Sequence, residues 1–125
     1  MEYQSPAKWS LRQIFTQSII QLESLAETDV GRSKEAGLYL ESAYLSRRHA
    51  VFVVDVDGNL MLRDLVTAFG TFVNGIALPS GGNQVLAHGD IVSFGLAHYG
   101  EATPPFLKMC FFEMITHDLQ CNGRC

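Results

Sequence analysis

The sequence predicts an all-β fold, an antiparallel β-sandwich, from three observations. Short segments rich in Val, Ile, Leu and Phe recur along the chain. Turn signals separate these segments at intervals of about eight to twelve residues, and no internal repeat or low-complexity stretch interrupts them. With 125 residues, 47% of them hydrophobic and 18% charged, the chain has a globular composition. It is long enough for one domain whose core needs no metal or disulfide.

The first segment is ambiguous. From residue 9 to residue 25 the apolar side chains have helical spacing, without Gly or Pro between them: Leu11, Ile14, Phe15, Ile19, Leu22 and Leu25. Periodicity alone predicts an amphipathic helix here. Residues 1–8 are expected to form a lead-in.

The later strands are expected between turns, at residues 37–40, 49–56, 60–63, 71–73, 76–78, 84–86, 91–94 and 106–115. The turns between them fall at Asp57-Gly58-Asn59, Asn74-Gly75 and His88-Gly89-Asp90. Asn-Gly is the strongest of these signals, because both central residues of a type I′ turn need positive φ. Residues 116–125 are expected to be a tail, so the predicted domain spans residues 9–115.

The formal net charge of −4 argues against general nucleic-acid binding, which needs a basic footprint. A few arginines can still form a local anion site on an acidic protein. No apolar run approaches the roughly 20 residues of a membrane-spanning helix, and the N-terminus lacks the layout of a signal peptide. We therefore expect a nuclear or cytoplasmic protein without a membrane partner.

The cysteines do not indicate a disulfide framework, since Cys110, Cys121 and Cys125 are odd in number and two lie at the very end. His117, Cys121 and Cys125 share a helical spacing, but a structural zinc site needs four ligands, usually with closer cysteines. No cofactor is expected.

Catalytic motifs are weak in this sequence. His88, Asp90 and Ser93 lie on one predicted hairpin, where alternating residues face opposite sides and cannot easily form a proton relay. The sequence has no nucleophile elbow, phosphate-binding loop or dinucleotide fingerprint. We therefore expect the protein not to be an enzyme.

Four sequence blocks carry more specific information. They are Gly31-Arg32, Ser46-Arg47-Arg48-His49, Gly70-Thr71-Phe72-Val73-Asn74-Gly75, and the run from Leu86 to Gly95 that contains Gly89-Asp90. In order and spacing these blocks resemble the forkhead-associated (FHA) domain pattern of Gly-Arg, Ser-x-x-His, Asn-Gly-Thr-x-x-Asn-Gly and Leu-x-x-Gly-Asp-x-x-x-Phe-Gly. The resemblance extends from about Trp9 to Phe112. It implies a sandwich of the SMAD/FHA type that binds a phosphothreonine-containing protein or peptide.

The resemblance also favours strands over a helix in the first segment. FHA domains have strands ahead of their Gly-Arg, often opening near a tryptophan, and Trp9 lies at about that place. Tertiary context commonly overrides a local periodic pattern.

By resemblance, Arg32 would bind the phosphate, Ser46 would donate its hydroxyl to a phosphate oxygen, and Arg47 would add a donor. His49 would tie the binding loop to the sandwich without touching the ligand. The remaining supporting positions would be Gly31, Gly70, Asn74 and Gly75. This agrees with the physical requirement, since a phosphate dianion needs fixed guanidinium, hydroxyl and N–H donors on accessible loops.

Plainer interpretations of the same residues stay open. Arg32 could pair with Glu35 or Asp29 as an ordinary surface arginine, and Ser46 could cap a turn. We expect Arg48 to point away from the phosphate.

One position departs from the family pattern. Phe69, preceded by Ala68, stands where FHA domains usually have the Asn that hydrogen-bonds the peptide backbone. Loss of this hydrogen bond costs about 1 kcal/mol of binding free energy, or roughly tenfold in affinity. Thr67 could partly compensate, or Phe69 could offer an apolar contact to a ligand side chain. The alternative function is a phosphate-independent interaction module on the same fold, including a homodimer.

Overall fold

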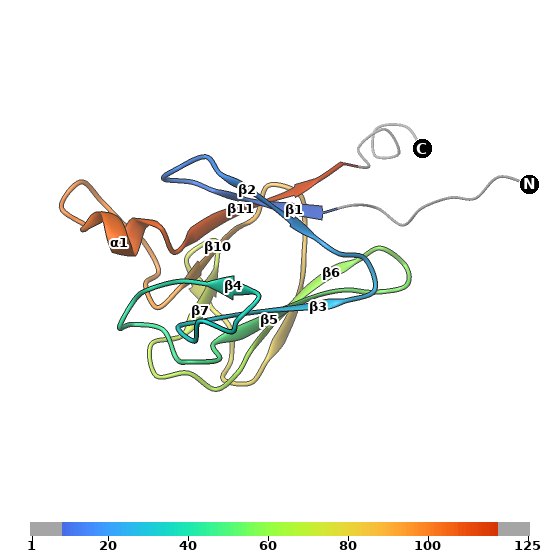
Figure 1. Ribbon diagram of the computed structural model, residues 1–125, viewed down its shortest axis with the longest axis horizontal. Coiled ribbons are helices and arrows are strands. Elements are labelled where there is room, and N and C mark those ends of the chain that lie inside the picture. The colour runs from blue at the N-terminus through green and yellow to red at the C-terminus, as the bar shows by residue number, and fades with distance from the viewer. Residues whose placement is uncertain (1–8, 118–125) are drawn as a thin grey trace, which may run out of the picture.

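Alternating burial along the strands builds two sheets that face each other (Figure 1). The computed structural model describes residues 9–117. A six-stranded sheet has the order β2-β1-β11-β10-β7-β8, formed by Ile19–Leu22, Trp9–Gln13, Phe111–Thr116, Ile91–Phe94, Thr71–Val73 and Ile76–Ala77. A five-stranded sheet has the order β4-β3-β5-β6-β9, formed by Leu38–Tyr39, Glu27–Gly31, Ala50–Val54, Leu60–Asp64 and Asn83–Leu86. The predicted β-sandwich is confirmed.

All strand pairs are antiparallel except β3 and β4, which run parallel over two residues. In β6 the alternation is plain: Leu60 and Leu62 are fully buried, while Met61 and Arg63 face outward. The same period of two recurs in β7 and in the second half of β11, whereas both residues of β8 are exposed.

Strands, not a helix, form the first segment, as the FHA resemblance implied. Leu11 and Leu22 enter the core, but Phe15 and Ile19 are exposed, so the helical spacing does not describe a buried stripe. The chain reverses between β1 and β2, where the Gln13 N–H donates to the Ser18 carbonyl at 2.8 Å. Gln17, with φ of 68°, makes this reversal.

The core lies between the sheets and is centred on aromatic rings. Phe94 of β10 meets Phe52 of β5 and Phe112 of β11 edge-on, each with ring centroids 6.1 Å apart. The imidazole of His49 packs against the same ring, with centroids 5.8 Å apart. The sandwich therefore ties its aromatic centre directly to the loop that carries the predicted phosphate-binding residues.

The strand predicted at residues 106–115 is wrong in its first part. Residues Pro105–Lys108 form the short helix α1, and β11 begins only at Phe111. Two prolines explain the difference, because Pro104 caps this helix and Pro105 opens it, and Pro is well suited to a first helical turn. Within residues 9–117, no helix has the length and apolarity needed to cross a membrane.

The loops beside β4 lie at the left of Figure 1, whereas β1 starts and β11 ends toward the right. Loops 32–37 and 40–49 flank β4, and loop 65–70 joins β6 to β7. Hydrogen bonds connect loop 40–49 to each of the other two: the Arg32 N–H donates to the Ser46 carbonyl, and the Leu65 N–H donates to the His49 carbonyl. The residues predicted to bind the phosphopeptide therefore lie on connected loops at one end of the sandwich.

Candidate functional site

The site begins where β3 ends, at a close approach between two backbones. A Cβ atom on Gly31 would lie 2.0 Å from the carbonyl oxygen of Arg47. No side chain fits there, so only glycine lets loop 40–49 pack against the end of β3. The Ser33 N–H donates to that same Arg47 carbonyl at 3.2 Å. Gly31 thus brings the two predicted phosphate-binding loops together.

Arg32 is anchored to the neighbouring loop through its backbone and its side chain. Its N–H donates to the Ser46 carbonyl, and its Nε–H donates to the Leu45 carbonyl, both at 3.0 Å. Within residues 9–117 its terminal guanidinium nitrogens have no hydrogen bond or ion pair, so Glu35 and Asp29 are not its partners. The exposed end of this guanidinium is therefore positioned but unoccupied by protein groups.

Ser46 and Arg47 lie in loop 40–49, whose backbone accepts two hydrogen bonds from Arg32. The Ser46 backbone is fixed at both ends, because its N–H donates to His49 Nδ1 at 3.0 Å and its carbonyl accepts from Arg32. Its half-buried hydroxyl forms no hydrogen bond inside the described range 9–117, so it does not cap a turn there. Arg47 is exposed. The hydroxyl and both guanidinium groups can all donate to an anion.

His49 joins two loops through both of its ring nitrogens. Since Nδ1 accepts the Ser46 N–H, the other nitrogen carries the proton, and Nε2–H donates to the Gly70 carbonyl at 2.9 Å. Burial lowers the pKa of His49, although the bond to Gly70 and the charge of Asp64 oppose that change. The neutral ring is thus favoured, as this arrangement of donor and acceptor requires. Its geometry agrees with the expected supporting role.

The Gly70 carbonyl is a meeting point for three segments. It accepts the His49 Nε2–H and also the Gly95 N–H, the latter at 2.8 Å. Gly70 itself has φ of 91°, a conformation that favours glycine. This single oxygen therefore connects loop 65–70 to loop 40–49 and to the end of β10.

Asp64, which the sequence motifs do not single out, builds loop 65–70. This buried carboxylate accepts hydrogen bonds from the hydroxyls of Thr67 and Thr71, and from the N–H groups of Val66 and Gly81, at 2.8 to 3.3 Å. Burial alone would raise the pKa of Asp64, but these four donors lower it below its ordinary value. The available signal was an Asp at the end of a predicted strand with Thr three residues later, a pattern typical of side-chain-capped turns.

Thr67 is occupied inside this loop. Its hydroxyl donates to Asp64 at 2.9 Å and accepts the Gly70 N–H at 3.1 Å. Ala68 beside it is exposed. Thr67 can therefore donate to a ligand only by giving up its bond to Asp64.

Phe69 is 53% exposed and lies against a second aromatic ring, that of Tyr44. The two ring centroids are 5.0 Å apart with an angle of 40° between the planes. Tyr44 precedes Ser46 by two residues in loop 40–49. The aromatic pair therefore spans the two loops on the same side of the sandwich as the polar groups.

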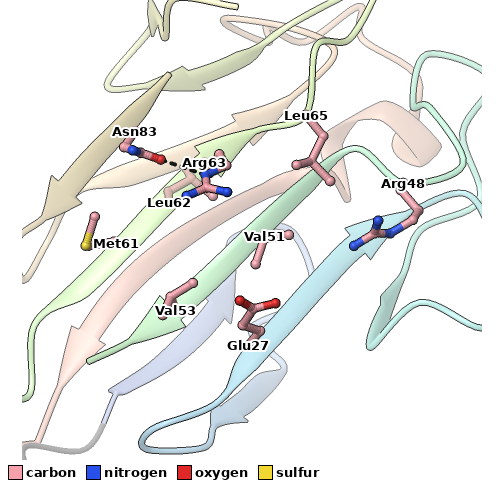
Figure 2. A pocket seen from close by; sticks show the side chains of 9 residues that line it. All are labelled: Glu27, Arg48, Val51, Val53, Met61, Leu62, Arg63, Leu65 and Asn83. Carbon is pink, nitrogen blue, oxygen red and sulfur yellow. Dashed lines mark hydrogen bonds between the residues drawn. The ribbon is translucent and has the colours of Figure 1, made fainter. Parts of the chain in front are cut away.

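Arg48 points away from this cluster, as expected. Figure 2 shows its side chain beside β3, at the rim of a groove on the outer face of the five-stranded sheet. Its Nε lies 3.8 Å from an Asp29 carboxylate oxygen. The groove has a volume of about 390 Å³ and includes Val51, Met61 and Arg63 in its lining. Arg47 and Arg48, adjacent in sequence, thus serve different surfaces.

The Asn74-Gly75 pair forms the predicted turn, with φ of 52° and 80°. The Asn74 amide donates to Asp90 at 3.0 Å and accepts the Ile91 N–H at 2.9 Å. These bonds lock the turn to the neighbouring hairpin. Both residues act in support and lie beyond β7 from loop 65–70.

The weak catalytic and metal patterns gain no support from the geometry. Ser93 is buried in β10, and Asp90 is bonded to Asn74 and to the Ala87 N–H. Over residues 9–117, no three His, Cys, Asp or Glu side chains group to hold a metal ion. Cys121 and Cys125 lie outside the described residues.

Comparisons with known proteins agree with this fold. Among solved structures, the N-terminal FHA domain of S. cerevisiae Rad53p, in complex with a phosphothreonine peptide, is 20% identical with a TM-score of 0.69. The match covers 94% of this chain and 99% of that one. Mycobacterium tuberculosis EmbR, in complex with a low-affinity phosphopeptide, is 25% identical with a TM-score of 0.67, over 87% of this chain and 24% of that one.

A Chlamydia trachomatis FHA domain is 19% identical with a TM-score of 0.67, over 86% of this chain and 96% of that one. No curated protein matches the sequence significantly. The sequence model of the FHA domain matches residues 28–95, which covers more than half of the chain and all three loops of the site. The chain therefore belongs to the FHA domain family.

Proposed function

We propose that this chain is a phosphothreonine-dependent protein–protein interaction module that serves as a signalling adaptor and not as an enzyme. One observation carries the proposal: the guanidinium of the exposed Arg32 is held at Nε by the Leu45 carbonyl, while its terminal nitrogens have no hydrogen bond or ion pair within residues 9–117. An exposed arginine positioned this way loses little conformational entropy when it binds a phosphate. The phosphothreonine peptide bound by the Rad53p domain is a ligand of the same class.

The three polar residues have distinct roles in this proposal. Arg32 makes a charge-assisted pair with the phosphate, and Ser46 donates its hydroxyl to a second oxygen. Arg47, exposed on the same loop, adds a more mobile positive charge at the edge. Gly31, His49 and Gly70 act in support, since they hold the loops and do not present donors to a ligand.

The peptide-facing half of the site has a different character. Phe69 and Ala68 offer no side-chain hydrogen bond, and the Thr67 hydroxyl is engaged with Asp64. The phosphate therefore supplies a larger share of the binding free energy than in a domain with Asn at this position. The absent bond weakens the peptide contact by roughly tenfold.

Phosphate-independent dimerisation is the less favoured function. Phe and Tyr side chains each offer about 150–250 Å², so at 53% and 39% exposure Phe69 and Tyr44 present roughly 200 Å². A stable interface needs about 800 Å² from each partner. The aromatic pair is large enough to contact one ligand side chain and too small to hold a homodimer.

We assign the module to residues 9–115, with residues 1–8 as a lead-in and residues 116–125 as a tail. A nuclear or cytoplasmic location follows from the proposed ligand, because phosphothreonine signalling is expected inside the cell. Its partner is a phosphothreonine-containing protein, and neither a membrane nor a nucleic acid is required.

The test is binding of an oriented phosphothreonine peptide library and its unphosphorylated counterpart. We expect the protein to prefer the phosphorylated library at least tenfold. Arg32→Ala should abolish the preference, whereas Arg48→Ala, the adjacent arginine on the outer sheet face, should keep it. Equal binding of both libraries by the unmodified protein would contradict the proposal, and so would equal loss in both variants.

A further inference from the structure

A groove with an apolar floor lies on the outer face of the five-stranded sheet (Figure 2). The alternation of β5 and β6 turns Val51, Val53 and Met61 toward this face, because the residues between them enter the core. Leu65, just beyond β6, adds a fourth apolar side chain. The solvated face of an antiparallel sheet is normally polar. Four apolar side chains in a groove of about 390 Å³ therefore indicate a contact surface.

The two walls of the groove carry polar groups. Arg63 and Asn83 line one side of it, and Glu27 and Arg48 line the other (Figure 2). Strand β5 runs between β3 and β6, and adjacent strands are about 4.8 Å apart, so the backbones of the two flanking strands are roughly 10 Å apart. An α-helix with its side chains has about this diameter, and an extended segment is narrower. The groove therefore has room for one peptide segment.

The arginines on the two walls are available to a ligand. Arg63 Nε–H donates to Asn83 Oδ1 at 2.9 Å, and within residues 9–117 its side chain has no ion pair. The side chain of Arg48 is 66% exposed, and its Nε lies 3.8 Å from an Asp29 carboxylate oxygen, which is longer than a hydrogen bond. Both guanidinium groups can therefore donate to a carboxylate from outside.

The charge of the groove selects an acidic ligand. Its nine lining residues include two arginines and one glutamate, a net charge of +1 on a chain whose formal net charge is −4. Glu27 pairs in register with Val53, whereas Arg63 pairs with Val51, one step closer to loop 40–49. Ligand carboxylates are thus favoured at the loop end of the groove, and ligand cations are disfavoured there.

The same charges disfavour a second copy of the chain as the occupant. In a two-fold dimer each residue of the contact surface meets the same surface on the partner. The arginines of the two grooves would then approach one another, and like charges across an interface are unfavourable. A segment with apolar side chains and carboxylates has no such cost.

We propose that this groove is a docking site, independent of phosphorylation, for a partner segment in which apolar side chains are flanked by carboxylates. The apolar side chains pack on Val51, Val53 and Met61, and the carboxylates pair with Arg48 and Arg63. A partner that carries both a phosphothreonine and such a segment is held at two points, which raises the overall affinity.

The experiment selects binders from a random library of unphosphorylated twelve-residue peptides built from Leu, Val, Glu and Ser. The affinity of the best binder is measured by fluorescence anisotropy, beside one derivative with Lys for every Glu and one with Ser for every Leu and Val. We expect the parent peptide to bind at least tenfold more tightly than either derivative.

Two variants locate the contact. Arg63→Glu should weaken the parent peptide at least tenfold and strengthen the Lys derivative, a reversal that a folding defect cannot produce. Met61→Ser should weaken the parent peptide about tenfold through lost apolar burial. The matched control is Lys34→Glu, which makes the same change of charge at an exposed residue outside the groove and should bind the parent peptide unchanged.

Three results would overturn the docking site: no peptide retained from the library, unchanged binding by Arg63→Glu, or loss of binding in Arg32→Ala, which would place the acidic peptide at the phosphate site. None of these results touches the proposed function, which depends on the preference for phosphorylated peptides. Arg63→Glu should keep that preference.

Discussion

The buried base of the binding loops, where Gly31, His49 and Asp64 lie, differs from their exposed rim, where Arg32 and Phe69 lie. At the base, Gly31, His49 and Asp64 are buried and every polar side-chain atom has a partner. At the rim, Arg32 and Phe69 are exposed, and the ends of their side chains face solvent. The base therefore determines where the loops are, and the rim determines what they bind.

This difference separates the residues that determine stability from those that determine recognition. Substitutions at the base should lower the free energy of unfolding and weaken binding only in consequence. Substitutions at the rim should change affinity and leave unfolding nearly unchanged, because exposed side chains away from special backbone positions contribute little to stability. The following variants test the base, from the largest expected effect to the smallest.

Gly31→Ala should have the largest effect. The added Cβ would lie 2.0 Å from the Arg47 carbonyl oxygen, and backbone cannot move aside as a flexible side chain can. We expect a loss of about 3 kcal/mol in the free energy of unfolding, measured by urea denaturation. Gly100→Ala, where nothing lies within 4 Å of the new Cβ, is the control. Equal stability of the two variants would show that loop 40–49 does not depend on this contact.

Asp64→Asn should come next. The amide nitrogen cannot accept the hydrogen bonds that one carboxylate oxygen now receives, so buried donors are left without a partner. The expected loss is about 2 kcal/mol, again by urea denaturation. Asp57→Asn, at an exposed carboxylate in the β5–β6 turn, should change stability by less than about 0.5 kcal/mol. If Asp64→Asn is as stable as the unmodified protein, the Asp64 carboxylate does not hold loop 65–70.

Thr67→Val removes a single hydroxyl and keeps the side-chain volume. It deletes the bond to Asp64 and the acceptor for the Gly70 N–H, for an expected loss of about 1 kcal/mol. Thr67→Ser, which keeps the hydroxyl, should recover most of this loss. Failure of serine to recover it would mean that the methyl group, and not the hydroxyl, holds the loop.

His49 should make stability depend on pH in a defined window. Its pKa is lower in the folded protein than its ordinary value of about 6.5, so the folded state resists protonation. Its contribution is complete above pH 6.5 and is lost as the pH falls below that value toward the folded pKa. The pKa of Asp64 is also lowered from its ordinary value of 3.8, so its contribution to stability is lost only at more acidic pH.

The free energy of unfolding of the unmodified protein should therefore be lower at pH 5.5 than at pH 7.5. His49→Gln should be less stable at both pH values and show a smaller difference between them. An unchanged difference in this variant would assign the pH dependence to another group.

Much of the fold could be predicted from the sequence because its turns carry their own chemistry. The Asn74-Gly75 turn adopts the positive φ values that the two residue types favour. The strands of the first segment could be predicted only from the family resemblance. The helical spacing of its apolar residues gives no sign that the chain reverses at Gln17. The α1 helix was missed because four helical residues are too few to produce a periodic pattern.

The site could be predicted only in part. Arg32, Ser46 and His49 follow from motif positions, and their geometry agrees with the roles assigned to them. The contact between Tyr44 and Phe69 could not be predicted, because it joins residues 25 positions apart through loop shapes that no local pattern specifies. Asp64 was missed for a related reason: its four donors come from positions 66, 67, 71 and 81.

The most direct test of the central claim is to titrate isotopically labelled protein with a selected phosphothreonine peptide and follow backbone amide resonances by NMR. We predict the largest amide shifts at Arg32, Ser46 and Arg47 and smaller shifts at Tyr44 and Phe69. None of these protein resonances should shift when the unphosphorylated peptide is added. Shifts concentrated instead at Val51 and Met61, in the groove on the outer sheet face (Figure 2), would contradict the account and place the ligand on the other surface.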